Sequence, residues 1–323
     1  MTSTPSRSQQ ALLIILTALV GAFVAVQSRV NGGLAVALSD GFMAALFSFG
    51  SGLVILTVGM IVWRPGRTGL RDVTEAIRSR DMPGWFIIGG LGGGLLVLSQ
   101  SLAVGVIGVA LFTVAVVAGQ TLSGLLIDRR GLGSMGAKPI TITRVVGTVV
   151  ALIAVIISVS TQVRTDIPIW LLILPLIAGC AIAWQQAMNG QVRQVASSAL
   201  TATWINFVFG TALLALIAGI HGLTVGVPTA WPTEPWLYIG GAIGVAFIAA
   251  QSVIVRHLGA LLMGLALVAG QLVMSAALDL IWPTDGHTVA VTTLIGTAIT
   301  IVAVVIAALP SRRLRAPRGA SSR

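Results

Sequence analysis

The sequence predicts an all-α polytopic membrane protein with ten transmembrane helices, arranged as two inverted five-helix repeats. Three observations carry this prediction. The 323 residues are 56% hydrophobic and only 9% charged, whereas soluble globular proteins have about 25% charged residues. Apolar segments of about 20 residues, the length that crosses a bilayer, recur along the chain. Finally, the sequence occurs twice. A water-soluble globule is therefore excluded.

The apolar segments divide the chain into two sets of five. We expect a first repeat at 1–161, a linker at 162–167, a second repeat at 168–309 and a basic cytoplasmic tail at 310–323. Each repeat is expected to cross the membrane five times. The ten predicted spans are 11–30, 41–63, 84–104, 107–127, 143–161, 168–188, 200–220, 236–255, 260–280 and 289–309.

The duplication is visible without gaps over the first two spans of each half. The stretch Gly21 to Gly52 matches Gly179 to Gly210 at an offset of 158 residues. From Trp85 onward the match continues at an offset of 151, which requires a deletion in a loop of the second copy. Identical pairs include Gln27/Gln185, Asn31/Asn189, Gln100/Gln251, Gln120/Gln271 and Asp128/Asp279. The chain is thus a duplicated unit.

The basic residues support the helix count and set the expected orientation. With ten spans, 17 of the 19 Lys and Arg residues fall on one side, and only Arg29 and Arg164 fall on the other. By the positive-inside rule both termini are cytoplasmic. The net charge of +10 is therefore a topology signal, and we expect no nucleic-acid partner. Because 18 of these residues are Arg, the chain is expected in a bacterial plasma (inner) membrane as a multi-pass protein.

Two connections have distinctive sequences. The polar stretch 64–81 carries five Arg residues, and its Leu70, Val73 and Ile77 recur at helical spacing. It is either a short helix lying on the inner leaflet or a solvated charged loop. The spans 84–104 and 107–127 are separated only by a break around Gly105 to Gly108, so they form a tight antiparallel hairpin. Dense glycines at the start of span 84–104 indicate close helix packing.

An odd number of spans per repeat has a functional consequence. The second copy must enter the membrane from the opposite face, so the repeats are inverted. Many secondary carriers use inverted repeats to exchange two conformations of similar energy, which opens a central cavity first to one side and then to the other. The duplication therefore indicates transport.

Amides, rather than charges, are the polar groups within the predicted spans. Gln120 and Gln271 each precede an Asp by eight residues, which places them about 12 Å from opposite ends of their helices, near the midplane. We predict that this pair contacts substrate at the centre. The vestibules are predicted to be lined by Gln27, Gln185, Gln100, Gln251, Asn31 and Asn189. Alternatively, these amides only bond helices to one another.

The chemistry of enzymes is missing from the sequence. All nine acids fall in loops or at helix ends, so no buried carboxylate is expected, and Asp128 and Asp279 are interpreted as interfacial with their roles left open. No metal-ligand spacing and no nucleophile–base set occurs, and only three histidines are present. We therefore expect no cofactor, no bound metal and no enzymatic activity.

Several motifs resemble the YdcZ branch of the drug/metabolite transporter (DMT) superfamily, in a form that fuses two repeats. They are Gln27-x-x-x-Asn31, the stretch 47–52, Gly89-Gly90, and 117–131 with its Gly119-Gln120 to Asp128 spacing, which recurs as Gly270-Gln271 to Asp279. The resemblance implies a ten-helix DMT-like carrier that acts as an exporter. After Asp279 the second copy departs from the pattern, with Leu-Ile-Trp-Pro in place of Arg-Arg-Gly.

The sequence thus predicts a secondary-type membrane transporter that exports a small polar or amphipathic metabolite by alternating access. Its expected partners are a small-molecule substrate and membrane lipids, with a homodimer left open. Three alternatives remain: a flippase for a lipid-linked substrate, an intramembrane enzyme and a non-transporting membrane subunit. A flippase would need a groove open to lipid, and an enzyme would need a catalytic cluster.

Overall fold

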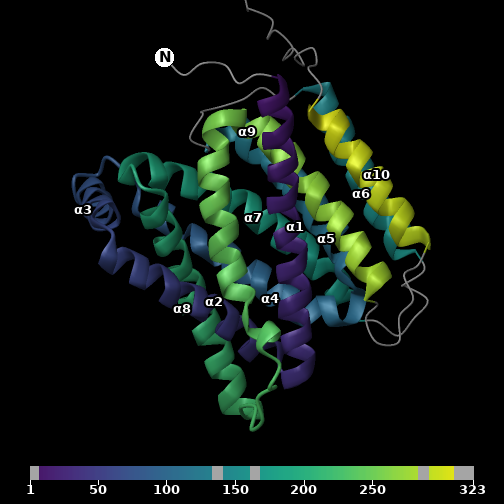
Figure 1. Ribbon diagram of the computed structural model, residues 1–323, viewed down its shortest axis with the longest axis horizontal. Helices are drawn as coiled ribbons and strands as arrows, with labels where there is room; N and C mark the ends of the chain where they lie inside the picture. The colour runs from purple at the N-terminus through teal and green to yellow at the C-terminus, as the bar shows by residue number, and fades with distance from the viewer. Residues whose placement is uncertain (1–6, 133–140, 161–167, 283–290, 309–323) are drawn as a thin grey trace, which may run out of the picture.

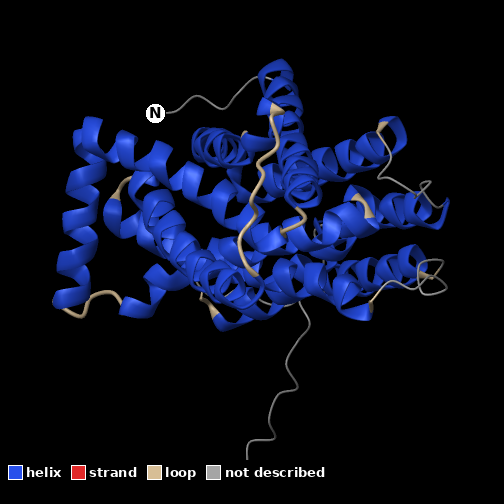
Figure 2. Ribbon diagram, turned by 90° about the horizontal axis from the view of Figure 1, so that it is seen from below, coloured by secondary structure: helices blue, strands red, loops and turns tan. Residues whose placement is uncertain are grey.

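Helices make up the regular structure throughout the described part of the chain (Figure 2). The computed structural model describes residues 7–132, 141–160, 168–282 and 291–308, without the side chains of most residues from 249 to 265. The predicted linker 162–167, the tail 310–323 and the side chain of Gln251 lie outside this description. The α-helices are α1 (Arg7–Leu38), α2 (Gly41–Val62), α3 (Arg64–Arg78), α4 (Gly90–Ile107), α5 (Val109–Arg130), α6 (Ile142–Val159), α7 (Ile169–Ala196), α8 (Ala199–Val225), α9 (Gly240–Ile281) and α10 (Val291–Ala308).

Six helical segments among the described residues are long and apolar enough to cross a membrane. They lie in α1, α2, the region from Gly84 to Ile107, α5, α7 and α8. Shorter apolar helices cover Ile142–Ser158, Ala266–Ile281 and Val291–Ile306. The all-helical membrane class predicted from composition is therefore confirmed.

Helix α9 differs from the sequence prediction. The span expected at 260–280 and all but the first four residues of the span expected at 236–255 belong to one helix of 42 residues. Such a helix would be about 63 Å long if straight, which is twice the thickness of the hydrocarbon core. Figure 1 shows α9 turning back, with one part on each side of α1 in that view. The corresponding turn in the first half is different, because α4 and α5 are separated by Gly108, whose φ is +80°.

Helix α1 is longer than the predicted span 11–30. It continues to Leu38, so Asn31 lies within the helix and is fully buried rather than interfacial. Its equivalent, α7, likewise extends to Ala196. The sequence prediction ended both helices too early because amides and glycines interrupt the apolar run, although both helices continue through these residues.

The two halves of the chain interlock. Helix α1 packs extensively on α9, and α7 packs on both α4 and α5. Helix α2 packs on α8, and α6 lies along α10, as Figure 1 also shows. Each of these contacts joins an element of one half to an element of the other. Most of the core is therefore an interface between the repeats.

Glycines permit the closest of these approaches. A Cβ at Gly21 in α1 would overlap the carbonyl oxygen of Leu267 in α9, and a Cβ at Gly179 in α7 would overlap that of Val116 in α5. The second contact is the first one repeated, at the offsets of 158 and 151 found in the sequence. A further matched pair joins Gly119 to Leu176 and Gly270 to Ala18. Glycine is needed at these four positions because the helix backbones touch.

The Arg-rich stretch after α2 forms the amphipathic helix α3, which settles the choice between a helix and a solvated loop. Its apolar face packs against other helices of the protein. Val73 is buried and packs with Val192 of α7 and Ala202 of α8. Gly69 also meets the carbonyl oxygen of Ala196. Helix α3 is thus attached to the helix bundle.

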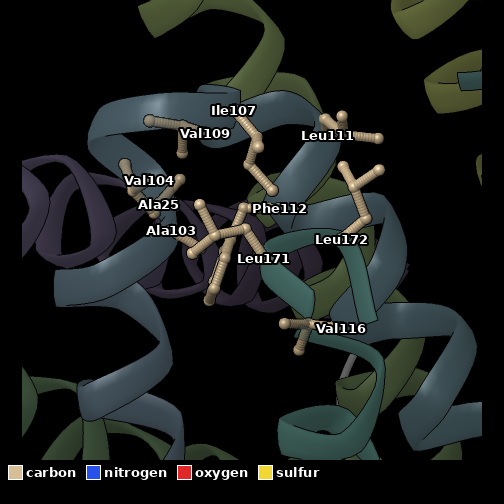
Figure 3. Close-up of a cluster of buried hydrophobic side chains, with 10 residues drawn as sticks. All are labelled: Ala25, Ala103, Val104, Ile107, Val109, Leu111, Phe112, Val116, Leu171 and Leu172. Carbon is tan, nitrogen blue, oxygen red and sulfur yellow. The ribbon is translucent and has the colours of Figure 1, made fainter. Parts of the chain in front are cut away.

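The end of the molecule where α4 meets α5, which we call the Gly108 end, is tightly packed (Figure 3). A hydrophobic cluster there combines Ala25 of α1, Val104 of α4, Phe112 of α5 and Leu171 of α7. Phe112 and Val104 are completely buried. The opposite end, where α5 finishes at Asp128, is called the Asp128 end. Helix α7 runs from the first end to the second, where Gln191 donates a hydrogen bond to the carbonyl oxygen of Leu132.

Candidate functional site: buried amides around a stacked phenylalanine pair

Two phenylalanines meet where α2 packs on α8. The rings of Phe49 and Phe207 stack with their centroids 4.3 Å apart and their planes inclined by 16°. Each ring covers a glycine of the opposite helix, so a Cβ at Gly52 would overlap Phe207 and a Cβ at Gly210 would overlap Phe49. All four residues are repeat equivalents. The pair therefore marks the centre of the interface between the two halves.

Asn206 lies beside this pair and has no hydrogen-bond partner. Only 1% of its surface is exposed, and neither its Nδ2 nor its Oδ1 is bonded within the described part of the protein. The buried Oε1 of Gln185 is also unpaired. A buried amide left without a partner costs about 1–3 kcal/mol per unsatisfied group. Such groups are rare in native proteins and call for a ligand, a water molecule or a second conformation.

Gly93 of α4 brings these groups together. A Cβ at this position would lie 3.1 Å from both Gln185 Oε1 and Phe49 Cζ, and 3.2 Å from Asn206 Oδ1. Two amide groups and an aromatic edge thus converge on the backbone of Gly93 and leave no room for a side chain there. Uncharged hydrogen-bonding groups with apolar contacts beside them are typical of a site for an uncharged polar molecule.

The equivalent place in the other half is bonded in part, since Asn31 Oδ1 is also buried there without a partner. Gly244 faces Gln27, the repeat equivalent of Gln185, but Gln27 Nε2 donates a 3.0 Å hydrogen bond to the carbonyl oxygen of Gly240. The equivalent of Asn206 is Ser48, a smaller residue whose hydroxyl is unpaired. Equivalent polar side chains in the two halves therefore differ in their hydrogen bonding.

A buried polar network extends from here to the Gly108 end. Asn31 Nδ2 donates to Gln100 Oε1 at 2.7 Å, and Gln100 Nε2 donates to the hydroxyl of Ser28 at 2.9 Å. Gln100 and Asn31 are completely buried. The structure thus brings together two of the predicted vestibule residues, but as a bonded network that joins α1 to α4 rather than as an open lining.

The equivalent amides toward the Asp128 end are more accessible. Gln185 and Asn189 are half-buried, and Gln186 is exposed. Gln120, predicted at the centre, is half-buried and donates a 3.2 Å hydrogen bond to Gln186 Oε1. Its mate Gln271 is buried. The predicted vestibule amides therefore differ in exposure. Gln27, Gln100 and Asn31 are buried, whereas Gln185 and Asn189, toward the Asp128 end, are half-buried.

Sequence reasoning missed Asn206 as a site residue. Its equivalent is Ser48, so comparing the two halves for identical polar residues does not select it. The signal that could have found it is the lone amide inside the apolar run 204–209. Phe49 and Phe207 occupy equivalent positions of the two matched stretches, but nothing in the sequence indicates that they stack.

The expectation that no carboxylate is buried was wrong. Asp279 is 6% exposed and Asp40 is 8% exposed. Each is stabilised by backbone N–H groups at the start of a helix, Asp40 by those of Phe42 and Met43 in α2. Position at a helix end had suggested solvent exposure, but other helices cover both side chains. Asp128 forms an ion pair with Arg144 at 2.6 Å. Among the described residues no cluster of three potential metal ligands occurs.

Comparisons with known proteins agree with this architecture. A family model described as "Putative inner membrane exporter, YdcZ" matches residues 12–157 and 170–306, one region in each half. A solved structure titled "Crystal structure of protein" is similar in fold, with a TM-score of 0.55 and 17% sequence identity over 96% of this chain and 100% of the other. No curated protein matches the chain. Because the family model covers most of both halves, the chain belongs to the YdcZ family of the DMT type.

Proposed function

We propose that the protein is a secondary-type carrier that exports a small polar or amphipathic metabolite by alternating access. The two halves would cross the membrane as inverted five-helix repeats, and α9 would supply two of the ten spans. The direction of transport follows the description of the family as inner membrane exporters. The charge distribution favours cytoplasmic termini, which would place the Gly108 end outside and the Asp128 end inside.

The matched contacts support inverted repeats that can exchange conformations. The contact of Gly21 with Leu267 and that of Gly179 with Val116 relate the halves by an approximate twofold axis through the interface. Polar groups at equivalent positions nevertheless differ, since Gln27 Nε2 donates to the carbonyl oxygen of Gly240 whereas the buried Oε1 of Gln185 has no partner. Two equivalent units in unequal states are what alternating access requires. In the proposed orientation, the protein is closed outside and more open inside.

The observation that carries the proposal is the unpaired amide of Asn206 beside Gln185 and the Phe49–Phe207 pair. Within the protein, a fully buried Asn without partners destabilises the fold, so its presence favours a role in binding. The groups around Gly93 carry no formal charge. The substrate is accordingly a molecule that offers both hydrogen-bond donors and acceptors and an apolar or ring surface.

A flippase is the second candidate because a groove of about 210 Å³ lies between α1, α9 and α10. Ile14, Leu272 and Val305 are among its lining residues, all of which are apolar. This lining suits an acyl chain but offers nothing to a polar headgroup, so a lipid-linked substrate fits the groove only in part. The central amides remain the better site.

A ligand screen with a matched variant tests the proposed function. Purified protein is heated with a library of small uncharged and amphipathic metabolites, and any hit is assayed for counterflow in proteoliposomes. A specific ligand raises the unfolding temperature by mass action. We expect hits that stabilise the wild type but not Asn206→Leu. If every compound shifts both proteins equally, Asn206 does not bind substrate and the site is wrong.

A further inference from the structure

Asp279 joins the end of α9 to the start of α5. Its Oδ1 accepts a 3.0 Å hydrogen bond from the N–H of Val109, and its Oδ2 accepts a 2.7 Å bond from the N–H of Ala110. These are the first N–H groups of a 22-residue helix, which have no partner within the helix. The aspartate is 170 residues away in sequence and belongs to the other half of the chain. The contact is therefore a tie between the two repeats.

The turn that receives this carboxylate depends on glycine. Gly108 separates α4 from α5 with a φ of +80°, a conformation that other residues adopt only with strain. A Cβ there would also lie 2.8 Å from Asp279 Oδ2. The turn and the carboxylate thus fit one another at the Gly108 end.

Helix α1 takes part in the same arrangement. The guanidinium carbon of Arg29 lies 5.6 Å from the ring centre of Trp282, three residues beyond Asp279. Trp282 in turn packs against Trp236, with ring centroids 5.4 Å apart. Arg29 of α1 and Trp236 thus pack against Trp282, just beyond the aspartate that binds the start of α5.

The repeat equivalent of Asp279 is in a different state. Asp128 forms an ion pair with Arg144 of its own repeat, and both side chains are partly exposed. The residues equivalent to Val109 and Ala110 are Ala260 and Leu261, and α9 runs through them as one helix from Gly240 to Ile281. One aspartate is thus bound across the repeat interface, while the other is not.

We propose that Asp279 is a latch that keeps the Gly108 end closed and must release α5 before that end can open. In the opposite conformation Asp128 would leave Arg144 and bind across the interface at its own end. The inference rests on the proposed alternating access and adds the residues that hold one conformation. Asp279 acts by positioning α5 and does not contact the substrate.

A reporter cysteine measures whether the Gly108 end opens. Ser101 of α4 is 4% exposed and follows Gln100 of the buried network. Ser101→Cys is introduced together with Cys180→Ser, which removes the single native cysteine. The purified protein in detergent is then treated with a water-soluble maleimide, and the labelling rate is followed. We expect slow labelling in this parent, because the side chain is covered.

Asp279→Asn retains the shape of the side chain but removes the charge that binds two N–H groups. We expect it to accelerate labelling of the reporter about tenfold or more, since charge-assisted bonds hold the closed state. The matched control is Asp128→Asn, which alters the equivalent residue at the other end and is expected to leave the rate unaccelerated. Equal rates in the parent and in Asp279→Asn would overturn the latch.

A second variant guards against a folding defect. Gly108→Ala strains the receiving turn while leaving Asp279 in place, and it should accelerate labelling in the same way. Each variant is checked by size-exclusion chromatography before labelling. The assay uses no substrate, so its outcome is separate from the proposed function. Accelerated labelling without any transport would support the latch and contradict the proposed carrier function. Transport with unchanged labelling would support the carrier function and contradict the latch.

Discussion

A substitution of Asn206 can distinguish a functional role from a structural one, because the amide of this residue is buried without a hydrogen-bond partner. Replacing it with the apolar Asn206→Leu removes unsatisfied polar groups at similar size. We expect the unfolding temperature in detergent to stay the same or rise, while ligand binding and transport are lost. A side chain that only bonded helices would behave in the opposite way.

Asn31→Leu supplies the comparison within the same protein. Asn31 donates to Gln100, which bonds Ser28, so the substitution leaves the buried Oε1 of Gln100 without its donor. We expect a loss of about 1–3 kcal/mol of stability. If Asn206→Leu were destabilised as strongly as Asn31→Leu, the unpaired state of Asn206 would not hold in solution.

Asp40 is buried, yet its contacts indicate a structural role. Its carboxylate accepts hydrogen bonds from the first turn of α2 and lies 3.8 Å from His221 Nε2. Its repeat equivalent, Ser198, caps α8 in the same manner through Thr201. The two equivalent residues therefore share the helix cap and not the negative charge.

Caps can be tested with a pair of substitutions. Asp40→Ala should destabilise the protein by about 1 kcal/mol, whereas Asp40→Asn should retain most of the stability because asparagine caps helices equally well. Thermal unfolding of both variants in detergent measures the difference. Loss of transport in a stable Asp40→Asn would contradict this account and assign a role to the negative charge.

At the scale of the helices, close backbone contacts decide where small residues are required. Gly119 of α5 meets the carbonyl oxygen of Leu176 in α7, whereas Gly124, one turn further along α5, has no atom within 4 Å of where a Cβ would lie. Gly119→Ala should destabilise the protein by about 1–3 kcal/mol through overpacking. Gly124→Ala should be neutral or stabilise it by up to about 1 kcal/mol.

The measurement is thermal unfolding of the two variants side by side in one detergent. Both substitutions add one methyl group to the same helix, so propensity and hydrophobicity are matched. Equal stability changes in the two variants would show that α5 and α7 do not approach as closely as described.

The sequence predicts most helices because apolar length and glycine content are local properties. It does not predict that α9 is one helix, since the break expected between 255 and 260 depends on how the neighbouring helices are arranged. It also ends α1 before Asn31, because a buried amide bonded to Gln100 cannot be recognised without the partner helix. Helix α3 shows the same limit, as its amphipathic pattern fits either a membrane surface or the protein surface on which Val73 packs.

The candidate site was less predictable than the fold. Repeat identity selected Gln100 and Asn31, which bond one another, and Gln27, which bonds the carbonyl oxygen of Gly240. It also selected Gln120, which bonds Gln186. It passed over Asn206, where the two halves differ. A carrier in one conformation uses equivalent positions unequally, so identity between repeats cannot by itself identify the groups that bind substrate in that state.

At the scale of the whole molecule, the account depends on two five-span units of opposite orientation. The repeat equivalents α2 and α8 are each followed by a polar segment, and these two segments must then lie on opposite faces of the membrane. Thr74 in α3 and Thr229 after α8 are both exposed. They are suitable sites for single cysteines in a Cys180→Ser background.

The most direct test is labelling of Thr74→Cys and Thr229→Cys in intact cells with a membrane-impermeant maleimide. We predict that Thr229→Cys reacts in intact cells, whereas Thr74→Cys reacts only after the cells are lysed. Reaction of both cysteines from the same side would show that the two units are parallel, and the alternating-access carrier proposed for this chain would be contradicted.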